Sequence, residues 1–201
     1  MNAQSHAGHA GDSPSPWIVR FAPLVRPHGN VIDLACGQGR HARLFAARGA
    51  RVVAVDRDSA ALARLAGISG VETRELDLEG GTWPLSGERF DGVVVSNYLY
   101  RPRLDELIDL VAPDGVLLYE TFAAGNEVYG RPSNPAFLLE RDELAERARG
   151  RLTVVGFEQG RAASKDRSVV VQRLAAVGSG RAWPPELPDG PRQGVRDGET
   201  R

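Results

Sequence analysis

Apolar runs alternate with amphipathic stretches through the middle of the chain, and this alternation predicts a parallel α/β sheet. Five runs are short and mostly apolar, as strands buried on both faces should be. They are residues 31–34, 52–55, 71–76, 90–96 and 115–120. Helical patterns between them cover residues 40–48, 60–66 and 103–111. Because a crossover helix lets the next strand run in the same direction, we expect these five strands to be parallel.

The first two helical patterns carry signals for their faces and ends. In the helix at 40–48, we expect Leu44, Phe45 and Ala47 to face the sheet and Gly49 to end the helix. Asp58 or Ser59 is expected to cap the helix that follows the second strand.

The pattern changes after Arg131. A helix is predicted at 141–148, followed by strands at 152–158 and 168–174. Only about nine residues, 159–167, separate these strands, which is too few for a parallel crossover with its helix. We therefore expect an antiparallel hairpin. The predicted fold class is α/β, a Rossmann-like doubly wound sheet of seven strands, mostly parallel with an antiparallel final strand and with helices on both faces.

Length and local composition predict one domain. A chain of 201 residues suffices for one α/β unit and is short for two. Residues 1–15 consist largely of Ala, Gly, Ser, His and Pro, and residues 178–201 are rich in Pro, Gly and Arg. We interpret these segments as a disordered leader and a disordered tail around a domain at 16–177.

Charge and cysteine content argue against several classes of protein. The formal net charge is -1, which argues against nucleic acid as a bulk substrate. The single cysteine, Cys36, cannot form an intramolecular disulfide or a multi-cysteine metal site. We interpret it as a small packing residue and expect a cytoplasmic protein. No apolar run is long enough to cross a membrane, and no spacing indicates a metal site.

The strongest chemical signal is the segment 31–40, Val-Ile-Asp-Leu-Ala-Cys-Gly-Gln-Gly-Arg. Glycines at a strand-to-helix turn let a ligand approach the backbone closely. Seventeen residues after Gly39, Asp56 ends the second strand. A carboxylate at that position can accept hydrogen bonds from both hydroxyls of a ribose. The pattern therefore predicts a nucleoside-containing cofactor.

Two cofactor classes fit this turn. Gly37, Gly39 and Ala42 also satisfy the G-x-G-x-x-A pattern of dinucleotide sites, so a nicotinamide-dependent oxidoreductase is the alternative. Asp33 argues against that alternative, because a carboxylate beside a pyrophosphate is repelled. S-Adenosyl-L-methionine instead carries an ammonium and a sulfonium group, which Asp33 can attract directly or through water. The other interpretation of Asp33 is a strand-end residue that caps the turn.

A second pair of signals follows the third strand. A carboxylate at Asp77 can accept a hydrogen bond from an adenine amino group, and the backbone amide of Leu78 can donate one to a ring nitrogen. The glycine turn, Asp56, this pair and the closing hairpin together resemble class I S-adenosylmethionine-dependent methyltransferases in order and spacing. The resemblance covers residues 16–175. Within that class the chain is similar to the tellurite-resistance methyltransferases, through its Gly-Gln-Gly-Arg turn and segment 137–174.

The resemblance implies a cofactor site. It implies that Asp33, Gly37 and Gly39 contact the amino acid part of the cofactor and that Asp56 binds its ribose. Asp77 and Leu78 are expected at the adenine, and Ser96 and Asn97 beside the methionine tail. Ala35 and Arg57 complete the expected set. Many members have glycine where this chain has Ala35, and alanine is small enough to leave binding intact.

The acceptor is less well specified. Methyl transfer needs alignment of acceptor, methyl and sulfur more than a strong nucleophile. We expect Tyr98 and Arg101, after the fourth strand, and Arg131, in the long loop after the fifth, to position the acceptor. Two arginines would suit an anionic small molecule. A non-catalytic S-adenosylmethionine-binding module is a further alternative, and the sequence indicates no oligomeric state.

Overall fold

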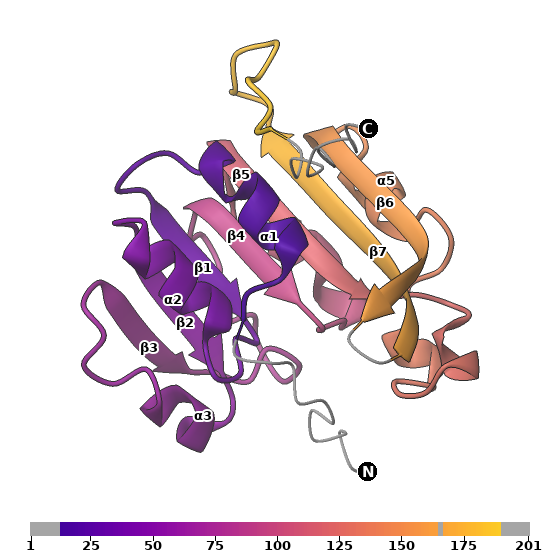
Figure 1. The fold of residues 1–201 in the computed structure, drawn as a ribbon. Helices are drawn as coiled ribbons and strands as arrows, with labels where there is room; N and C mark the ends of the chain where they lie inside the picture. The colour runs from indigo at the N-terminus through magenta and orange to yellow at the C-terminus, as the bar shows by residue number, and fades with distance from the viewer. Residues whose placement is uncertain (1–12, 165–166, 190–201) are drawn as a thin grey trace, which may run out of the picture.

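One seven-stranded sheet runs through the computed structural model, which describes residues 13–164 and 167–189 (Figure 1). Its order is β3-β2-β1-β4-β5-β7-β6. The first five strands are parallel, and β7 is antiparallel to both of its neighbours. The strands are β1 Asn30–Leu34, β2 Arg51–Asp56, β3 Val71–Glu75, β4 Phe90–Ser96, β5 Val111–Phe122, β6 Leu152–Ser164 and β7 Arg167–Gly178. The predicted fold class, including the antiparallel final strand, is confirmed.

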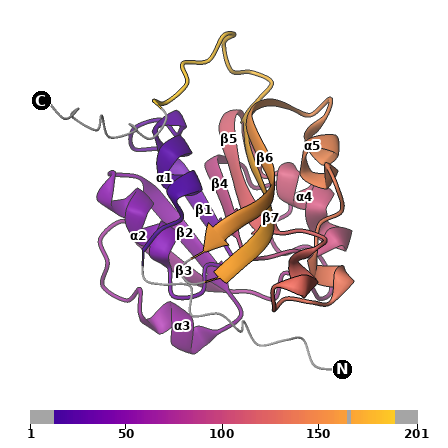
Figure 2. The same cartoon turned by 45° about the vertical axis from the view of Figure 1, so that its right-hand side comes forward.

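Helices cover both faces of the sheet (Figure 2). α1 and α2 lie on one face, and α4 and α5 lie on the other. The α-helices are α1 Pro16–Phe21, α2 Arg40–Ala47, α3 Ser59–Ala63, α4 Leu104–Ile108 and α5 Glu143–Ala148, and the 3-10 turns are η1 Ala22–Leu24, η2 Arg101–Arg103, η3 Asn126–Val128 and η4 Pro135–Phe137. Within the described residues, no helix is long and apolar enough to cross a membrane.

Alternation along the strands divides the apolar side chains between two cores. In β1, Ile32 and Leu34 join the core under α4 and α5, whereas Val31 joins the core under α1 and α2. Phe45 of α2 is 1% exposed in the second of these cores. Truncation of such a side chain costs about 3–5 kcal/mol, so this packing fixes α2, and with it the turn before α2, on the sheet.

The inward face of α2 differs from the prediction. His41, Ala42 and Phe45 are buried, whereas Leu44 is half-buried and Ala47 is exposed. The buried face therefore begins one turn earlier than apolar character indicated. His41 is inside because its Nε2 accepts a hydrogen bond from the backbone N–H of Ser15, 3.1 Å away. Burial, with the nearby Arg40, lowers the pKa of His41 to about 3, so the ring stays a neutral acceptor.

Two other boundaries also differ. The helix predicted at 103–111 ends at Ile108, because Leu110 accepts a hydrogen bond from Phe90 and Val111 pairs with Phe90 in the sheet. The final strands are antiparallel as predicted but longer, since the expected loop at 159–167 pairs almost throughout. The hairpin therefore extends past the end of β5, whose last partner on β7 is Val171.

The described residues at both ends of the domain are tied to it. Ser15 is buried and its side chain accepts a hydrogen bond from the Trp17 amide, which caps α1. Gly178 pairs with Leu152, and the Arg181 side chain donates a hydrogen bond to the Leu24 carbonyl. Most of the predicted leader and half of the predicted tail lie outside the described residues.

Candidate functional site

The turn between β1 and α2 has an unusual backbone. Ala35, Gly37 and Gly39 all have positive φ, at +51°, +54° and +75°. A Cβ added at Gly39 would clash with the side chain of Leu65, whereas one added at Gly37 would meet nothing within 4 Å. Gly39 therefore serves backbone conformation and packing, while Gly37 leaves open space beside the backbone. This is a cradle into which a ligand can approach closely.

Asp56 joins the end of β2 to this turn. Its Oδ2 accepts a hydrogen bond from the Gly37 amide at 2.7 Å, and its Oδ1 accepts one from the Asp58 amide at 3.0 Å. The residue is only 5% exposed. A carboxylate has about four acceptor positions, so both oxygens can still accept from a ligand.

A groove opens beside Asp56 at the carboxyl ends of the first four strands. Five of the ten residues predicted to bind the cofactor line it, together with Tyr98 from the predicted acceptor set. The lining residues are Ala35, Asp56, Arg57, Leu76, Asp77, Leu78, Glu79 and Tyr98. This is where a parallel sheet offers a crevice for a ligand.

The wall after β3 is made by Asp77 and Leu78. Asp77 is exposed, and its Oδ1 accepts a hydrogen bond from the Glu79 amide at 2.9 Å, which stabilises the local turn. Leu78 is 6% exposed and packs into the core under α4. The pair thus places the Asp77 carboxylate at the surface of the groove and the buried Leu78 side chain beneath it.

Asp33 lies beneath the turn and not in the groove. It is 1% exposed, and its Oδ2 accepts a hydrogen bond from the Ala42 amide of α2 at 2.9 Å. Burial raises the pKa of this carboxyl to about 7, against the lowering effects of the Ala42 amide and the Arg40 charge. The capping interpretation therefore describes its contact in this structure, and any attraction to a cofactor acts alongside that contact.

A larger open cleft lies at the opposite, amino ends of the strands. Arg74 there pairs with Glu72 and Glu88, at 2.7 and 3.0 Å. Ligands of open parallel sheets bind beyond the carboxyl ends, so we place the candidate site in the smaller groove.

Comparison with known proteins agrees with this geometry. Residues 31–115, which include the glycine turn, Asp56 and β4, match a family described as a methyltransferase domain. This match supports a class I S-adenosylmethionine-dependent methyltransferase. No curated protein matches its sequence.

Solved structures share the fold of this methyltransferase. TehB from Haemophilus influenzae is 19% identical with a TM-score of 0.65, over 78% of this chain and 59% of TehB. The methyltransferase thus spans less than two thirds of TehB. A TehB-like methyltransferase from Corynebacterium glutamicum is 16% identical with a TM-score of 0.57, over 78% of this chain and 84% of its own. The 1,6-didemethyltoxoflavin-N1-methyltransferase of Burkholderia thailandensis was solved with S-adenosylhomocysteine. It is 25% identical with a TM-score of 0.58, over 80% of this chain and 75% of its own.

The groove fits the cofactor of this family. Gly37 leaves backbone space open, Asp56 offers acceptors for ribose hydroxyls, and the Tyr98 hydroxyl is a buried polar atom to which no described residue is hydrogen-bonded. The methyltransferase-domain match over residues 31–115 supports S-adenosylmethionine as the cofactor and not a nicotinamide dinucleotide.

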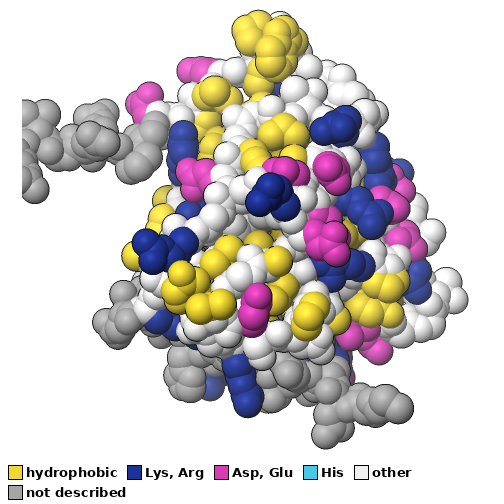
Figure 3. Space-filling view, turned by 90° about the vertical axis from the view of Figure 1, so that its right-hand side faces the viewer, with side chains coloured by type: hydrophobic (Ala, Val, Ile, Leu, Met, Phe, Trp, Pro, Cys, Tyr) yellow, Lys and Arg dark blue, Asp and Glu magenta, His cyan; other side chains and the backbone are white. Residues whose placement is uncertain are grey.

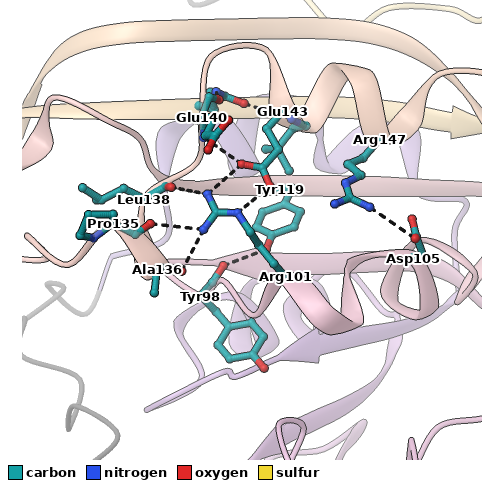
Figure 4. Close-up of polar contacts among 12 residues, drawn as sticks. Tyr98, Arg101, Asp105, Tyr119, Pro135, Ala136, Leu138, Glu140, Glu143 and Arg147 are labelled. Atoms are coloured by element: carbon teal, nitrogen blue, oxygen red, sulfur yellow. Dashed lines mark hydrogen bonds and ion pairs between the residues drawn. The ribbon is translucent and has the colours of Figure 1, made fainter.

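Arg101 does not have the role predicted for it. All five N–H groups of its guanidinium are used within the protein (Figure 4). Two of them go to the Glu143 carboxylate, and the others go to the carbonyls of Pro135, Ala136 and Leu138. No donor is left for an anion, so Arg101 fastens the segment before α5 to the end of β4.

The other residues predicted after β4 and β5 are dispersed. Tyr98 turns away from the Arg101 network (Figure 4) and lines the cofactor groove. Asn97 is exposed, and its amide donates to the Glu120 carbonyl at 2.9 Å. Arg131 is exposed on the loop after β5. The structure does not bring Arg101 and Arg131 together as an anion site.

A polar row not predicted as a unit crosses the same edge of the sheet. Ser96 of β4 is paired in register with Glu120 of β5, and Glu120 with Arg173 of β7. Arg173 donates to the Glu120 carboxylate, whose side chain is only 11% exposed, and Arg40 donates to the Ser96 hydroxyl at 2.9 Å. Burial lowers the pKa of Arg40, while the charges of Glu120 and Asp33 oppose that effect. The signal available in the sequence was a polar residue in the mostly apolar run of each of these strands.

Proposed function

We propose that this methyltransferase acts on a small-molecule acceptor bound above the carboxyl ends of β4 and β5. The observation that carries the proposal is the polar row Ser96, Glu120 and Arg173, with Arg40 above it. The row lies one strand beyond β1, whose end leads into the glycine turn. An acceptor there would be next to the amino acid end of the cofactor.

The groove supports the predicted division of cofactor contacts. Asp56 would hold the ribose, and Asp77 and Leu78 the adenine. Gly37 and Gly39 would hold the amino acid part, with Asp33 attracting its ammonium group from beneath the turn and Ser96 and Asn97 beside it. Arg40 adds a cation next to Asp33, and an amino acid zwitterion requires a partner of each sign.

The reaction needs positioning more than proton transfer. Bound S-adenosylmethionine supplies a methyl group on positively charged sulfur. The residues of the row would orient the acceptor for in-line attack, and α1 and the segment before α5 would limit access of water. Glu120 and Arg173 hold each other in place. The molecule to be methylated would therefore meet one fixed hydrogen-bond acceptor, Glu120, and one fixed donor, Arg173.

The acceptor class follows from surface charge and the polar row. Basic and acidic side chains are interspersed on the side of the molecule that carries β6 and α5 (Figure 3), which does not suit a polyanion. The B. thailandensis relative methylates 1,6-didemethyltoxoflavin, a small molecule, at a nitrogen, as its name states. The proposal that the methyl acceptor is an anion is still supported by Arg131. Arg101 no longer supports it, because its donors are all used within the protein.

The test is transfer of labelled methyl groups from S-adenosylmethionine into fractions of a cell extract. We expect label in the small-molecule fraction and none in protein or nucleic acid. Label confined to macromolecules would overturn the small-molecule proposal, and no label with tight cofactor binding would favour a non-catalytic binding module.

A matched pair of variants tests the row. With the acceptor identified, Glu120→Gln should reduce turnover at unchanged affinity for S-adenosylhomocysteine. Glu158→Gln is the control, because Glu158 also contacts Arg173 but its side chain is half exposed. Equal turnover in both variants would remove the row from the acceptor site.

A further inference from the structure

The Tyr98 hydroxyl is a buried polar group without a protein partner. It is shielded from solvent, and no described residue donates to it or accepts from it. Leaving a buried hydroxyl unpaired costs about 1–3 kcal/mol. Such a cost is retained where a ligand supplies the missing partner, and the ring of Tyr98 lines the cofactor groove.

The position of Tyr98 is fixed from behind. The Tyr119 hydroxyl donates to the Tyr98 carbonyl at 2.9 Å, and the next residue, Leu99, is 4% exposed in the core. On the other side, the Asn97 amide is bonded to the Glu120 carbonyl. The ring points away from Arg101 and Glu143 (Figure 4). The hydroxyl is therefore held in place before any ligand binds.

The neighbours of Tyr98 determine what it can bind. Asp77 and Glu79, which line the same groove, carry carboxylates that only accept hydrogen bonds. Burial raises the pKa of the Tyr98 hydroxyl, and the charges of Glu79 and Asp77 raise it further. The hydroxyl thus stays protonated and is a hydrogen-bond donor next to two carboxylates that only accept. The ring nitrogens of a purine without attached hydrogen are acceptors, which Asp77 and Glu79 cannot satisfy.

We propose that the Tyr98 hydroxyl donates a hydrogen bond to a ring nitrogen of the cofactor's adenine, and so determines cofactor affinity and base specificity. The ribose hydroxyls have their acceptor in Asp56, which also lines the groove. Tyr98 is then a binding residue for the nucleoside and does not touch the acceptor, in contrast to its predicted role.

The test is calorimetry of Tyr98→Phe with S-adenosylhomocysteine and with its 1-deaza, 3-deaza and 7-deaza analogues. We expect the variant to bind S-adenosylhomocysteine about three- to ten-fold more weakly, the effect of one hydrogen bond. With one of the three analogues, in which the partner nitrogen is replaced by carbon, wild type and variant should bind equally. The KM for S-adenosylmethionine should rise while kcat is unchanged.

Thermal unfolding separates this role from a structural one. Without ligand, Tyr98→Phe should melt no lower than wild type, because it removes an unpaired buried hydroxyl. Tyr100→Phe is the control, since Tyr100 is two residues away and does not line the groove. Unchanged affinity in Tyr98→Phe, an equal loss with all three analogues, or lost turnover at unchanged affinity would each overturn the proposal.

Discussion

The guanidinium of Arg101 forms two parallel hydrogen bonds with the carboxylate of Glu143, each 2.9 Å long. The pair joins the start of η2, after β4, to the start of α5, and the two residues are 42 positions apart in the chain. Because Arg101 also bonds three carbonyls of the segment between them, it fixes the path of the chain that follows the long loop. A residue predicted to hold substrate thus holds the fold around the site.

Arg101→Met should lower the free energy of unfolding by about 2–3 kcal/mol, because it leaves the Glu143 carboxylate unpaired at a site with little solvent. Urea unfolding measures this change. Arg147→Met is the control, since Arg147 pairs with Asp105 at 3.4 Å and both side chains are exposed, and it should change the free energy by about 0.5 kcal/mol or less. Equal effects of the two substitutions would contradict the role given to Arg101.

Asp33→Asn should stabilise the ligand-free protein at pH 8 and not near pH 4. Burial raises the pKa of Asp33 to about 7 from 3.8, so the folded state binds its proton more tightly than the unfolded state. Stability from this group is present below pH 4 and is lost as pH rises through 7. Asparagine can still accept from Ala42 and carries no charge. The difference in Tm between variant and wild type should therefore increase from pH 5 to pH 8, and a constant difference would refute the buried-charge explanation.

Removal of residues 1–12 and 190–201 should leave the Tm and the affinity for S-adenosylhomocysteine unchanged, because their composition provides little apolar surface to bury. A chain starting at Pro16 should be less stable by about 0.5–2 kcal/mol, the value of a helix cap, since it lacks Ser15. Calorimetric melting of the two truncated chains compares them directly. A large loss of stability in the chain that lacks only residues 1–12 and 190–201 would show that part of a terminal segment packs on the domain.

Sequence patterns predicted the features that depend on local order. β4 was predicted with its observed ends because its residues are buried on both faces, and Asp56 because it follows an apolar strand into a turn. Long-range partners were not predictable in the same way. Glu143 lies 42 residues from Arg101, and only the folded chain shows that they meet. The buried place of His41 likewise depends on Ser15, 26 residues away.

The cofactor site was predicted better than the acceptor site for a related reason. The residues of the groove lie in short turns directly after strands, so strand order alone brings Ala35, Asp56 and Asp77 together. The row Ser96, Glu120 and Arg173 depends on the register of β4, β5 and β7. Register is set by packing and hairpin geometry, which the sequence pattern does not resolve to one residue.

The most direct test of the account is the shift in melting temperature with S-adenosylhomocysteine and with NAD, in wild type and in Asp56→Ala. A ligand at about 100 times its Kd adds about 2.7 kcal/mol of stability. Asp58→Ala is the control, because Asp58 caps α3 beside the site, and its loss should lower stability but keep the ligand shift. We expect S-adenosylhomocysteine to raise the Tm of wild type and Asp58→Ala, a much smaller shift in Asp56→Ala, and none with NAD. A shift with NAD and none with S-adenosylhomocysteine, or an undiminished shift in Asp56→Ala, would contradict the account.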